Sequence, residues 1–177
     1  MNIAAPNRGE IVQATEADLP AISNLAGIIW RAGYPGIITR AQIDYMLARM
    51  YAPDLMRAEI RSQGIHYHVI FVDGKMAGFA SHGPTSEPGV AKLHKLYLLP
   101  ELHGCGLGSR LLRHCEKAVH TAGTYRLILS VNKRNAKAIA AYQRNGFVIT
   151  KSVVTDIGGG FVMDDFIMAK KLICAKT

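Results

Sequence analysis

The amino-acid sequence predicts a mixed α/β fold, and two kinds of pattern carry this prediction. Segments whose apolar residues recur at helical spacing alternate with short apolar segments of the kind that form strands. The dipeptide Asp73-Gly74 separates two of these short segments, 65–72 and 75–82, and is a strong signal for an antiparallel hairpin. The sequence contains no repeat, low-complexity tract or linker, so we expect a single domain over residues 1–177.

Local signals predict one strand and three helices before this hairpin. Thr15 is a good N-cap for the first helix, and Pro53 suits the first turn of the third. The second helix has its apolar residues on one face and follows a loop rich in glycine and proline. The expected elements are a strand at 10–14, a helix at 15–30, a loop at 32–39, and helices at 39–50 and 53–62.

After the hairpin, strands and helices alternate. In the strand that follows Gly89, the apolar positions step by three from Leu93 to Leu96, which breaks the period of two and indicates a β-bulge. Asn135 and Gly146 mark the two ends of a later helix as N-cap and C′ residue. The expected elements are a fourth strand up to residue 100, helices at 107–119 and 136–144, and strands at 125–131, 147–155 and 162–170.

The segment between the fourth strand and the following helix is rich in glycine. Glycines let a backbone approach a ligand closely, and the unpaired N–H groups of a helix N-terminus attract an anion, so this order of elements predicts a phosphate site. The spacing fits neither a P-loop, which needs Lys and then Ser or Thr after its last glycine, nor the G-x-G-x-x-G fingerprint of dinucleotide sites. The segment consists of His103, Gly104, Cys105, Gly106, Leu107, Gly108 and Ser109.

Three separated motifs together resemble the core of the GNAT acetyltransferases. The family pattern L-Y-V-x-P is similar to Leu-Tyr-Leu-Leu-Pro at 96–100, and the pattern Q/R-x-x-G-x-G/A is similar to residues 103–108. One position departs from the second pattern, because His103 replaces the usual Gln or Arg and would be a pH-sensitive donor. The third pattern, N-x-x-A-x-x-x-Y-x-x-x-G-F, is matched by Asn135, Ala138, Tyr142 and Gly146-Phe147.

The resemblance implies the GNAT fold, in which about four helices flank a twisted, mostly antiparallel sheet of six to seven strands. In that fold the bulged fourth strand splays from the fifth and leaves a slot for the pantetheine arm of acetyl-CoA. The resemblance also implies an acetyl-CoA-dependent N-acetyltransferase that needs no metal, with Tyr142 as the general acid for the leaving thiolate. The residues that it assigns to acetyl-CoA are Leu96, Tyr97, Leu98, the segment from His103 to Ser109, Asn135 and Tyr142.

The group that removes a proton from the attacking amine is harder to identify. An alkylammonium has a pKa of about 10.4 and must lose a proton before it attacks. His94 on the fourth strand is the best single candidate for the base. Asp164 and Asp165 are alternatives that act through water or by attracting a cation, and water alone can serve, as in many members of the family.

In GNAT enzymes the acceptor pocket lies between the loop that joins the first two helices and the hairpin of the last two strands. Here these are residues 30–38 and 155–165. They supply Tyr34 as a candidate wall of the pocket and Asp164 and Asp165 as candidate groups for binding a cation.

A second, shorter resemblance concerns the acceptor itself. Residues 42–47 and 161–170 are similar to bacterial polyamine acetyltransferases of the spermidine/spermine type. We therefore expect a small cationic amine such as a polyamine as acceptor. Transfer to a protein N-terminus or a lysine, and an acetyl-CoA-binding sensor module without turnover, are the alternatives.

The net charge of +8 is confined to one part of the sequence. Residues 110–151 contain nine Lys and Arg residues and only Glu116 as an acid, whereas the residues on either side are neutral overall. This asymmetry favours a polyanionic cofactor. A nucleic-acid partner is not expected, because the basic segment lacks interleaved aromatic residues and a base-reading motif. The basic residues expected near phosphates are Arg110, Arg113, Lys133, Arg134 and Lys137.

Cysteines and apolar segments argue against several other classes. Cys105, Cys115 and Cys174 are odd in number and widely spaced, which suggests neither a disulfide framework nor a metal site. No apolar segment is long enough to span a membrane, and residues 1–10 lack the hydrophobic segment of a signal peptide. We expect a cytoplasmic protein with no membrane partner, which acts on a small amine and could form a homodimer.

Overall fold

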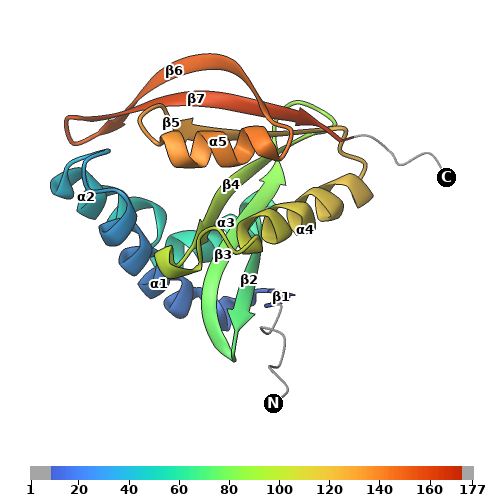
Figure 1. Ribbon diagram of the computed structural model, residues 1–177, viewed down its shortest axis with the longest axis horizontal. Coiled ribbons are helices and arrows are strands. Elements are labelled where there is room, and N and C mark those ends of the chain that lie inside the picture. The colour runs from blue at the N-terminus through green and yellow to red at the C-terminus, as the bar shows by residue number, and fades with distance from the viewer. Residues whose placement is uncertain (1–8, 173–177) are drawn as a thin grey trace.

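The computed structural model describes residues 9–172, in which seven strands form one sheet and helices cover both of its faces (Figure 1). The strands are β1 (Glu10–Gln13), β2 (His66–Val72), β3 (Lys75–Pro84), β4 (Val90–Leu98), β5 (Arg126–Asn132), β6 (Val148–Gly158) and β7 (Phe161–Lys171). The helices are α1 (Leu19–Gly33), α2 (Arg40–Met50), α3 (Pro53–Gln63), α4 (Leu107–Thr121) and α5 (Ala136–Arg144). Short 3-10 turns at Glu16–Asp18 and Pro100–Leu102 precede α1 and the glycine-rich segment.

The order of the strands shows where the sheet divides. The order is β1-β2-β3-β4-β5-β7-β6, and neighbouring strands are antiparallel except for β4 and β5. These two parallel strands pair only over residues 90–93 and 126–129, so beyond that point they diverge. The mixed fold and the splayed strand pair that the resemblance implied are therefore confirmed.

A β-bulge occupies the position that the apolar pattern of β4 predicts. Ser81 of β3 lies opposite Lys95, and His82 lies opposite Leu93, so His94 has no partner on β3. An extra residue of this kind bends the strand and increases its twist. The bulge therefore turns the second half of β4 away from β5.

The residue after the bulge ties β4 to α3. Lys95 is buried, and its Nζ lies 2.8 Å from Glu59 Oε2 and 2.7 Å from the Tyr67 hydroxyl. Burial lowers the pKa of Lys95, and the Glu59 carboxylate offsets part of this effect. Because loss of one partner would leave the other charge buried and uncompensated, this pair holds the bulged part of β4 in place.

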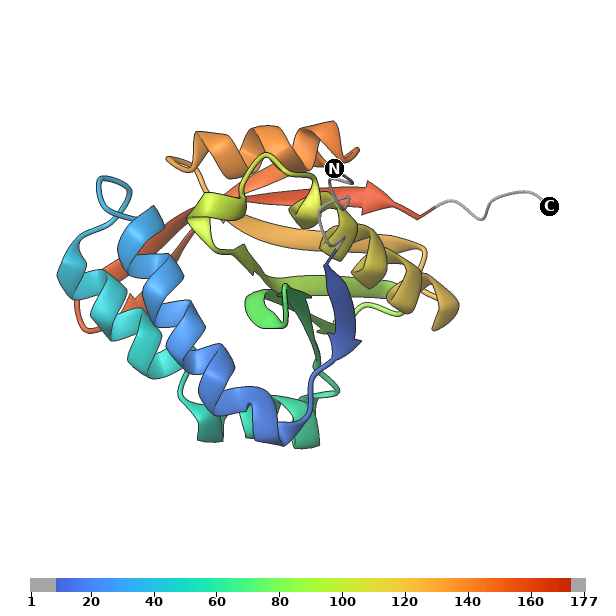
Figure 2. The same cartoon turned by 60° about the horizontal axis from the view of Figure 1, so that its bottom comes forward.

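Two apolar cores lie on opposite faces of the sheet. The helices α1, α2 and α3 cover one face, and α4 and α5 cover the other (Figure 2). Alternate residues of β4 contribute to both, since Tyr97 packs against the first core and Leu98 belongs to the second. The first core includes Leu19, Ile22, Trp30, Met46, Met56 and Phe79, and the second includes Ile70, Leu93, Leu111, Leu127, Phe147 and Met168.

Two elements differ from the prediction by three residues or more at a boundary. The helix expected at 15–30 begins at residue 19 and continues to Gly33. Residues 16–18 form a separate 3-10 turn before it, in which Asp18 Oδ2 accepts a hydrogen bond from the Thr15 N–H at 2.7 Å. β6 extends to Gly158, beyond the expected end at 155, since its pairing with β7 continues into the hairpin.

Two expectations concern residues outside the described part of the chain. Cys174 and the segment before residue 9 are not among the residues that the structure describes. Within residues 9–172, no helix is both long and apolar enough to cross a membrane.

Candidate active site

The divergence of β4 and β5 leaves main-chain groups of β4 without a neighbouring strand on one side. Residues 96–98 pair with β3 but not with β5. The N–H of Leu99 donates to the Ala77 carbonyl of β3 at 2.9 Å. Because N–H groups alternate between the two edges of a strand, those of Leu96 and Leu98 point into the open side. Such donors suit the amides of pantetheine and can polarise a thioester carbonyl.

The glycine-rich segment lies between this slot and α4. Gly104 and Gly106 have φ values of 83° and 78°, a left-handed backbone that favours glycine. Gly106 is the N-cap of α4 and has no side chain to bond the first N–H groups of the helix. A Cβ on Gly108 would lie 3.4 Å from Leu98 Cδ1, so α4 begins close against β4. The unpaired N–H groups and the positive end of the α4 dipole make this a site for a phosphate group.

His103 ties the glycine-rich segment to β4. Its Nε2 lies 3.1 Å from the Leu98 carbonyl oxygen, and because a carbonyl only accepts, Nε2 carries the proton. The sequence predicted that this ring is a pH-sensitive donor for the coenzyme, and in the structure one of its two nitrogens already bonds β4. In the structure the ring fixes the loop to the slot, and the main-chain N–H groups remain for the phosphates.

The helix α5 follows β5, the strand on the other side of the slot. Asn135 caps it, since its Oδ1 accepts a main-chain N–H of the first turn at 3.2 Å. Tyr142 packs edge-on against Phe147, with 5.8 Å between the ring centroids. Burial raises the pKa of Tyr142, and the nearby Tyr34 adds to this effect. The phenol keeps its proton at neutral pH, as a general acid must.

Tyr34, at the end of α1, belongs to an aromatic cluster. Its ring stacks on Trp30 with 4.3 Å between the centroids, and Trp30 lies 5.9 Å from Tyr97 of β4. Burial raises the pKa of Tyr34, the Tyr97 and Asn135 side chains lower it, and the carboxylate of Asp165 raises it further. The Tyr34 hydroxyl therefore lies where side chains of β4, α5 and β7 come together.

The two aspartates of β7 point to opposite faces of the sheet, as alternation along a strand requires. Asp164 has a half-exposed side chain and forms an ion pair with Lys133. Asp165 is only 5% exposed, and its Oδ1 has no hydrogen-bond partner in the described part of the chain. Burial raises the pKa of Asp165, while Lys92 opposes the shift. Of the two carboxylates, Asp165 is the one that affects the pKa of Tyr34 and has an oxygen without a partner in the described residues.

His94, the candidate base, is the extra residue of the β-bulge. Its side chain is partly open to solvent. Desolvation by the surrounding protein lowers its pKa to about 4, and the charges of Lys92 and Lys95 contribute. The ring is uncharged at neutral pH and can accept a hydrogen bond, but it is a far weaker base than an alkylamine.

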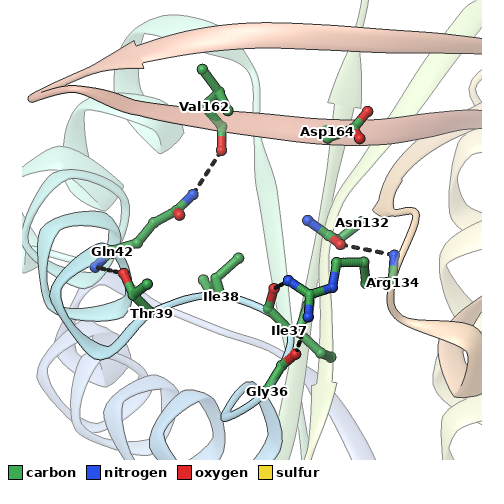
Figure 3. A pocket seen from close by; sticks show the side chains of 9 residues that line it. All are labelled: Gly36, Ile37, Ile38, Thr39, Gln42, Asn132, Arg134, Val162 and Asp164. Carbon is green, nitrogen blue, oxygen red and sulfur yellow. Dashed lines mark hydrogen bonds between the residues drawn. The ribbon is translucent and has the colours of Figure 1, made fainter.

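A cavity of about 430 Å³ opens beside the slot, between the loop after α1, the start of α2, the end of β5 and β7 (Figure 3). Asp164 lines it, and so does Arg134, which was expected near a phosphate. Tyr34 and Asp165 are not among the lining residues, and Asp165 instead affects the pKa of Tyr34. The residues that line the cavity are Gly36, Ile37, Ile38, Thr39, Gln42, Asn132, Arg134, Val162 and Asp164.

Hydrogen bonds between distant segments fix the walls of this cavity. Gln42 of α2 donates through Nε2 to a carbonyl of β7 at 2.8 Å, and Tyr45 donates to a carbonyl of β6 at 2.7 Å. Arg134 donates to two carbonyls of the loop after α1 (Figure 3). The hairpin and the loop, which the resemblance named as walls of the acceptor pocket, are thus both attached to the rest of the protein.

Two basic residues have partners other than those expected. Lys133 and Arg134 were placed near phosphates by their position in the basic segment. In the structure they follow the end of β5, where Lys133 pairs with Asp164 and Arg134 binds the loop after α1. Gln42 and Asn132 were not predicted as site residues at all. Asn132 accepts the Arg134 N–H at 2.9 Å and so forms a turn, which an asparagine after a strand can indicate. The position of Gln42 has no comparable local signal.

Comparison with known proteins identifies the family. The matching family model is the acetyltransferase (GNAT) family, over residues 30–147, which is more than half of the chain. The spermidine N(1)-acetyltransferase of Thermoplasma acidophilum is 30% identical over 166 residues, which cover 92% of this chain and 96% of that protein. The streptothricin acetyltransferase of Streptomyces lavendulae is 35% identical over 75 residues, 42% of this chain and 40% of that protein.

A solved structure agrees with this match. The PaiA N-acetyltransferase of Thermoplasma acidophilum, crystallised with coenzyme A, superimposes with a TM-score of 0.78 and 29% identity over 92% of this chain and 98% of that one. The span of the family model contains the slot, the glycine-rich segment and α5. The chain belongs to the GNAT acetyltransferase family and is an acetyl-CoA-dependent N-acetyltransferase.

Proposed function

We propose that the acceptor is a small cationic amine such as a polyamine, which attacks acetyl-CoA directly, in the cytoplasm. The observation that carries this proposal is Asp165, a buried carboxylate whose Oδ1 has no partner in residues 9–172. An unpaired buried carboxylate is costly, and an ammonium group of the acceptor would remove that cost. The similarity to a spermidine N(1)-acetyltransferase supports the same class of acceptor.

In the proposed reaction, one carbon–nitrogen bond forms and one carbon–sulfur bond breaks. The uncharged amine attacks the thioester carbonyl, and the N–H groups of Leu96 and Leu98 stabilise the developing oxyanion. As the carbon–sulfur bond breaks, Tyr142 gives its proton to the thiolate of coenzyme A and later regains one from solvent. The nitrogen that attacked loses its extra proton to water, which restores a neutral amide.

We assign His94 a part in that last proton loss. Its uncharged ring does not repel a cationic acceptor and can accept a hydrogen bond from the amine or from a water molecule. Because its pKa is about 4, the ring passes the proton on to water rather than holding it.

The two β7 aspartates have different parts in this proposal. Asp165 holds the distal ammonium of an extended amine while the reacting nitrogen reaches the thioester. Asp164, which lines the cavity and pairs with Lys133, is less available to a ligand. Asp164→Asn is therefore a matched control for Asp165→Asn, with the same change one residue away.

Steady-state kinetics with spermidine and with butylamine test the assignment. We expect Asp165→Asn to raise KM for spermidine about tenfold or more and KM for butylamine by less than about threefold, because only the longer amine uses the contact. Asp164→Asn should have a small effect on both. Equal effects of Asp165→Asn on the two amines, or a parent enzyme that acetylates peptide amines but not spermidine, would refute the polyamine assignment.

A further inference from the structure

One side chain joins the turn between β5 and α5 to the loop that follows α1. Arg134 donates from Nη1 to the Ile37 carbonyl at 2.9 Å and from Nη2 to the Gly36 carbonyl at 2.7 Å (Figure 3). The planar guanidinium fork matches two neighbouring oxygens, which a lysine ammonium cannot do as well. The contact spans almost one hundred residues of sequence and connects two parts of the candidate active site.

Both ends of this connection are ordered by local hydrogen bonds. On the turn, the Arg134 N–H donates to Asn132 Oδ1 at 2.9 Å, and the next residue, Asn135, caps α5. In the loop, the Ile37 N–H donates to the Tyr34 carbonyl at 2.9 Å. Because local hydrogen bonds order both segments, the guanidinium sets the distance between them.

One of the two connected segments carries a residue of the proposed acceptor site, and the other carries residues of the proposed coenzyme site. The loop begins with Tyr34, a wall of the proposed acceptor site, whereas α5 carries Asn135 and Tyr142, which the family resemblance assigns to the coenzyme. The Asn135 side chain lowers the pKa of Tyr34, and Tyr34 in turn raises the pKa of Tyr142, so Tyr34 lies close to both residues. A change in the distance between loop and turn would therefore change the distance between the amine and the thioester.

We propose that Arg134 is a positioning residue, which acts through the Gly36 and Ile37 carbonyls to set the width of the acceptor site relative to α5. It contacts neither acceptor nor thioester in this role. The proposal rests on the proposed function only in taking this site as the place where the amine binds, since the hydrogen bonds of Arg134 do not depend on it. It replaces the expectation from the charge pattern that Arg134 binds a phosphate of the coenzyme.

Two substitutions and a control separate these roles. Arg134→Ala removes the fork, and Arg134→Lys keeps the charge but bonds one carbonyl at a time. Arg144→Ala is the control, because it removes an equal charge from an exposed site in the last turn of α5. The measurements are KM and kcat with spermidine, the Kd of acetyl-CoA by calorimetry, and hydrogen exchange of the Ile37 and Ile38 amides, which both bond to the Tyr34 carbonyl.

For Arg134→Ala we expect about a tenfold increase in KM for spermidine, a Kd of acetyl-CoA within about twofold of the parent, and faster exchange of the two loop amides. Arg134→Lys should restore part of each effect, and Arg144→Ala should show none. Unchanged loop exchange in Arg134→Ala, or a weakened Kd of acetyl-CoA as its main effect, would overturn the proposal. If spermidine is not acetylated by the parent enzyme, the polyamine assignment fails, while the exchange and calorimetric results still decide the role of Arg134.

Discussion

Tyr142 is the residue on which the proposed chemistry depends most directly. Burial raises its pKa, so the phenol is protonated at neutral pH and can donate to a thiolate. Substitution Tyr142→Phe removes only the hydroxyl and keeps the ring that packs on Phe147. We expect kcat to fall by about tenfold to a thousandfold, while the Kd of acetyl-CoA stays nearly the same. A variant with the kcat of the parent would show that Tyr142 only packs against Phe147 and is not the general acid.

His94 leads to a prediction about pH. With a pKa of about 4, its ring has already lost its proton at pH 5 and above, so it cannot produce a rise in rate between pH 6 and 8. The free fraction of an alkylamine instead grows about tenfold per pH unit below its pKa of about 10.4. We expect kcat/KM for spermidine to rise with pH through this range without a plateau, and His94→Gln to lower the rate without changing the shape of the profile.

A plateau of kcat/KM near pH 7 that disappears in His94→Gln would contradict this prediction. It would mean that His94 titrates near neutrality in the enzyme and acts as the base itself.

The contact between α4 and the first hairpin depends on three histidines. His68 Nε2 lies 3.0 Å from His82 Nε2, and His68 Nδ1 lies 3.1 Å from His114 Nε2 of α4. Burial lowers the pKa of His68 to about 3 and that of His82 to about 4, and the neighbouring histidines contribute. Protonation of each ring would place two N–H groups against each other, so the folded state favours the neutral rings.

These shifts predict acid destabilisation in a defined range. The lowered pKa values add stability that is complete above the unfolded value of about 6.5 and is lost as the pH falls toward 4, at about 1.4 kcal/mol per pH unit for each histidine that must gain a proton on unfolding. Urea unfolding between pH 7 and 5 measures this slope. We expect His68→Gln to flatten it, and an equal slope in parent and variant would contradict the prediction.

Sequence patterns predict the elements of this protein better than the contacts between them. The bulge at His94 follows from the spacing of apolar residues, and both ends of α5 follow from Asn135 and Gly146, because these signals are local. The partners of His103 and Arg134 could not be predicted in this way, because each depends on where a distant segment lies in the fold.

Of the two aspartates, the sequence shows that only one can face the acceptor side, because side chains alternate along a strand. It does not show which one. In the structure, Asp164 lines the cavity, whereas Asp165 lies opposite Asn132 of β5 and affects the pKa of Tyr34.

At the scale of the whole molecule, the split in the sheet brings two binding regions together. The glycine-rich segment and the start of α4 lie on the coenzyme side, and the loop after α1 and the β6–β7 hairpin lie on the acceptor side (Figure 1). Part of the excess positive charge of residues 110–151 lies on α4 and α5, whereas Arg134 lines the cavity on the acceptor side. In the proposed function, the polyanionic coenzyme would approach the slot along α4 and α5, and the cationic acceptor would approach it from the side of the α1 loop and the hairpin.

The most direct measurement is the release of coenzyme A thiol from acetyl-CoA by the purified protein, with and without spermidine, combined with mass spectrometry of the amine. We predict thiol release that depends on spermidine and saturates with both substrates, together with one acetylated spermidine for each thiol released. Thiol release at the same rate without an amine, or none with any amine while acetyl-CoA still binds, would contradict the proposed transfer to a small cationic amine.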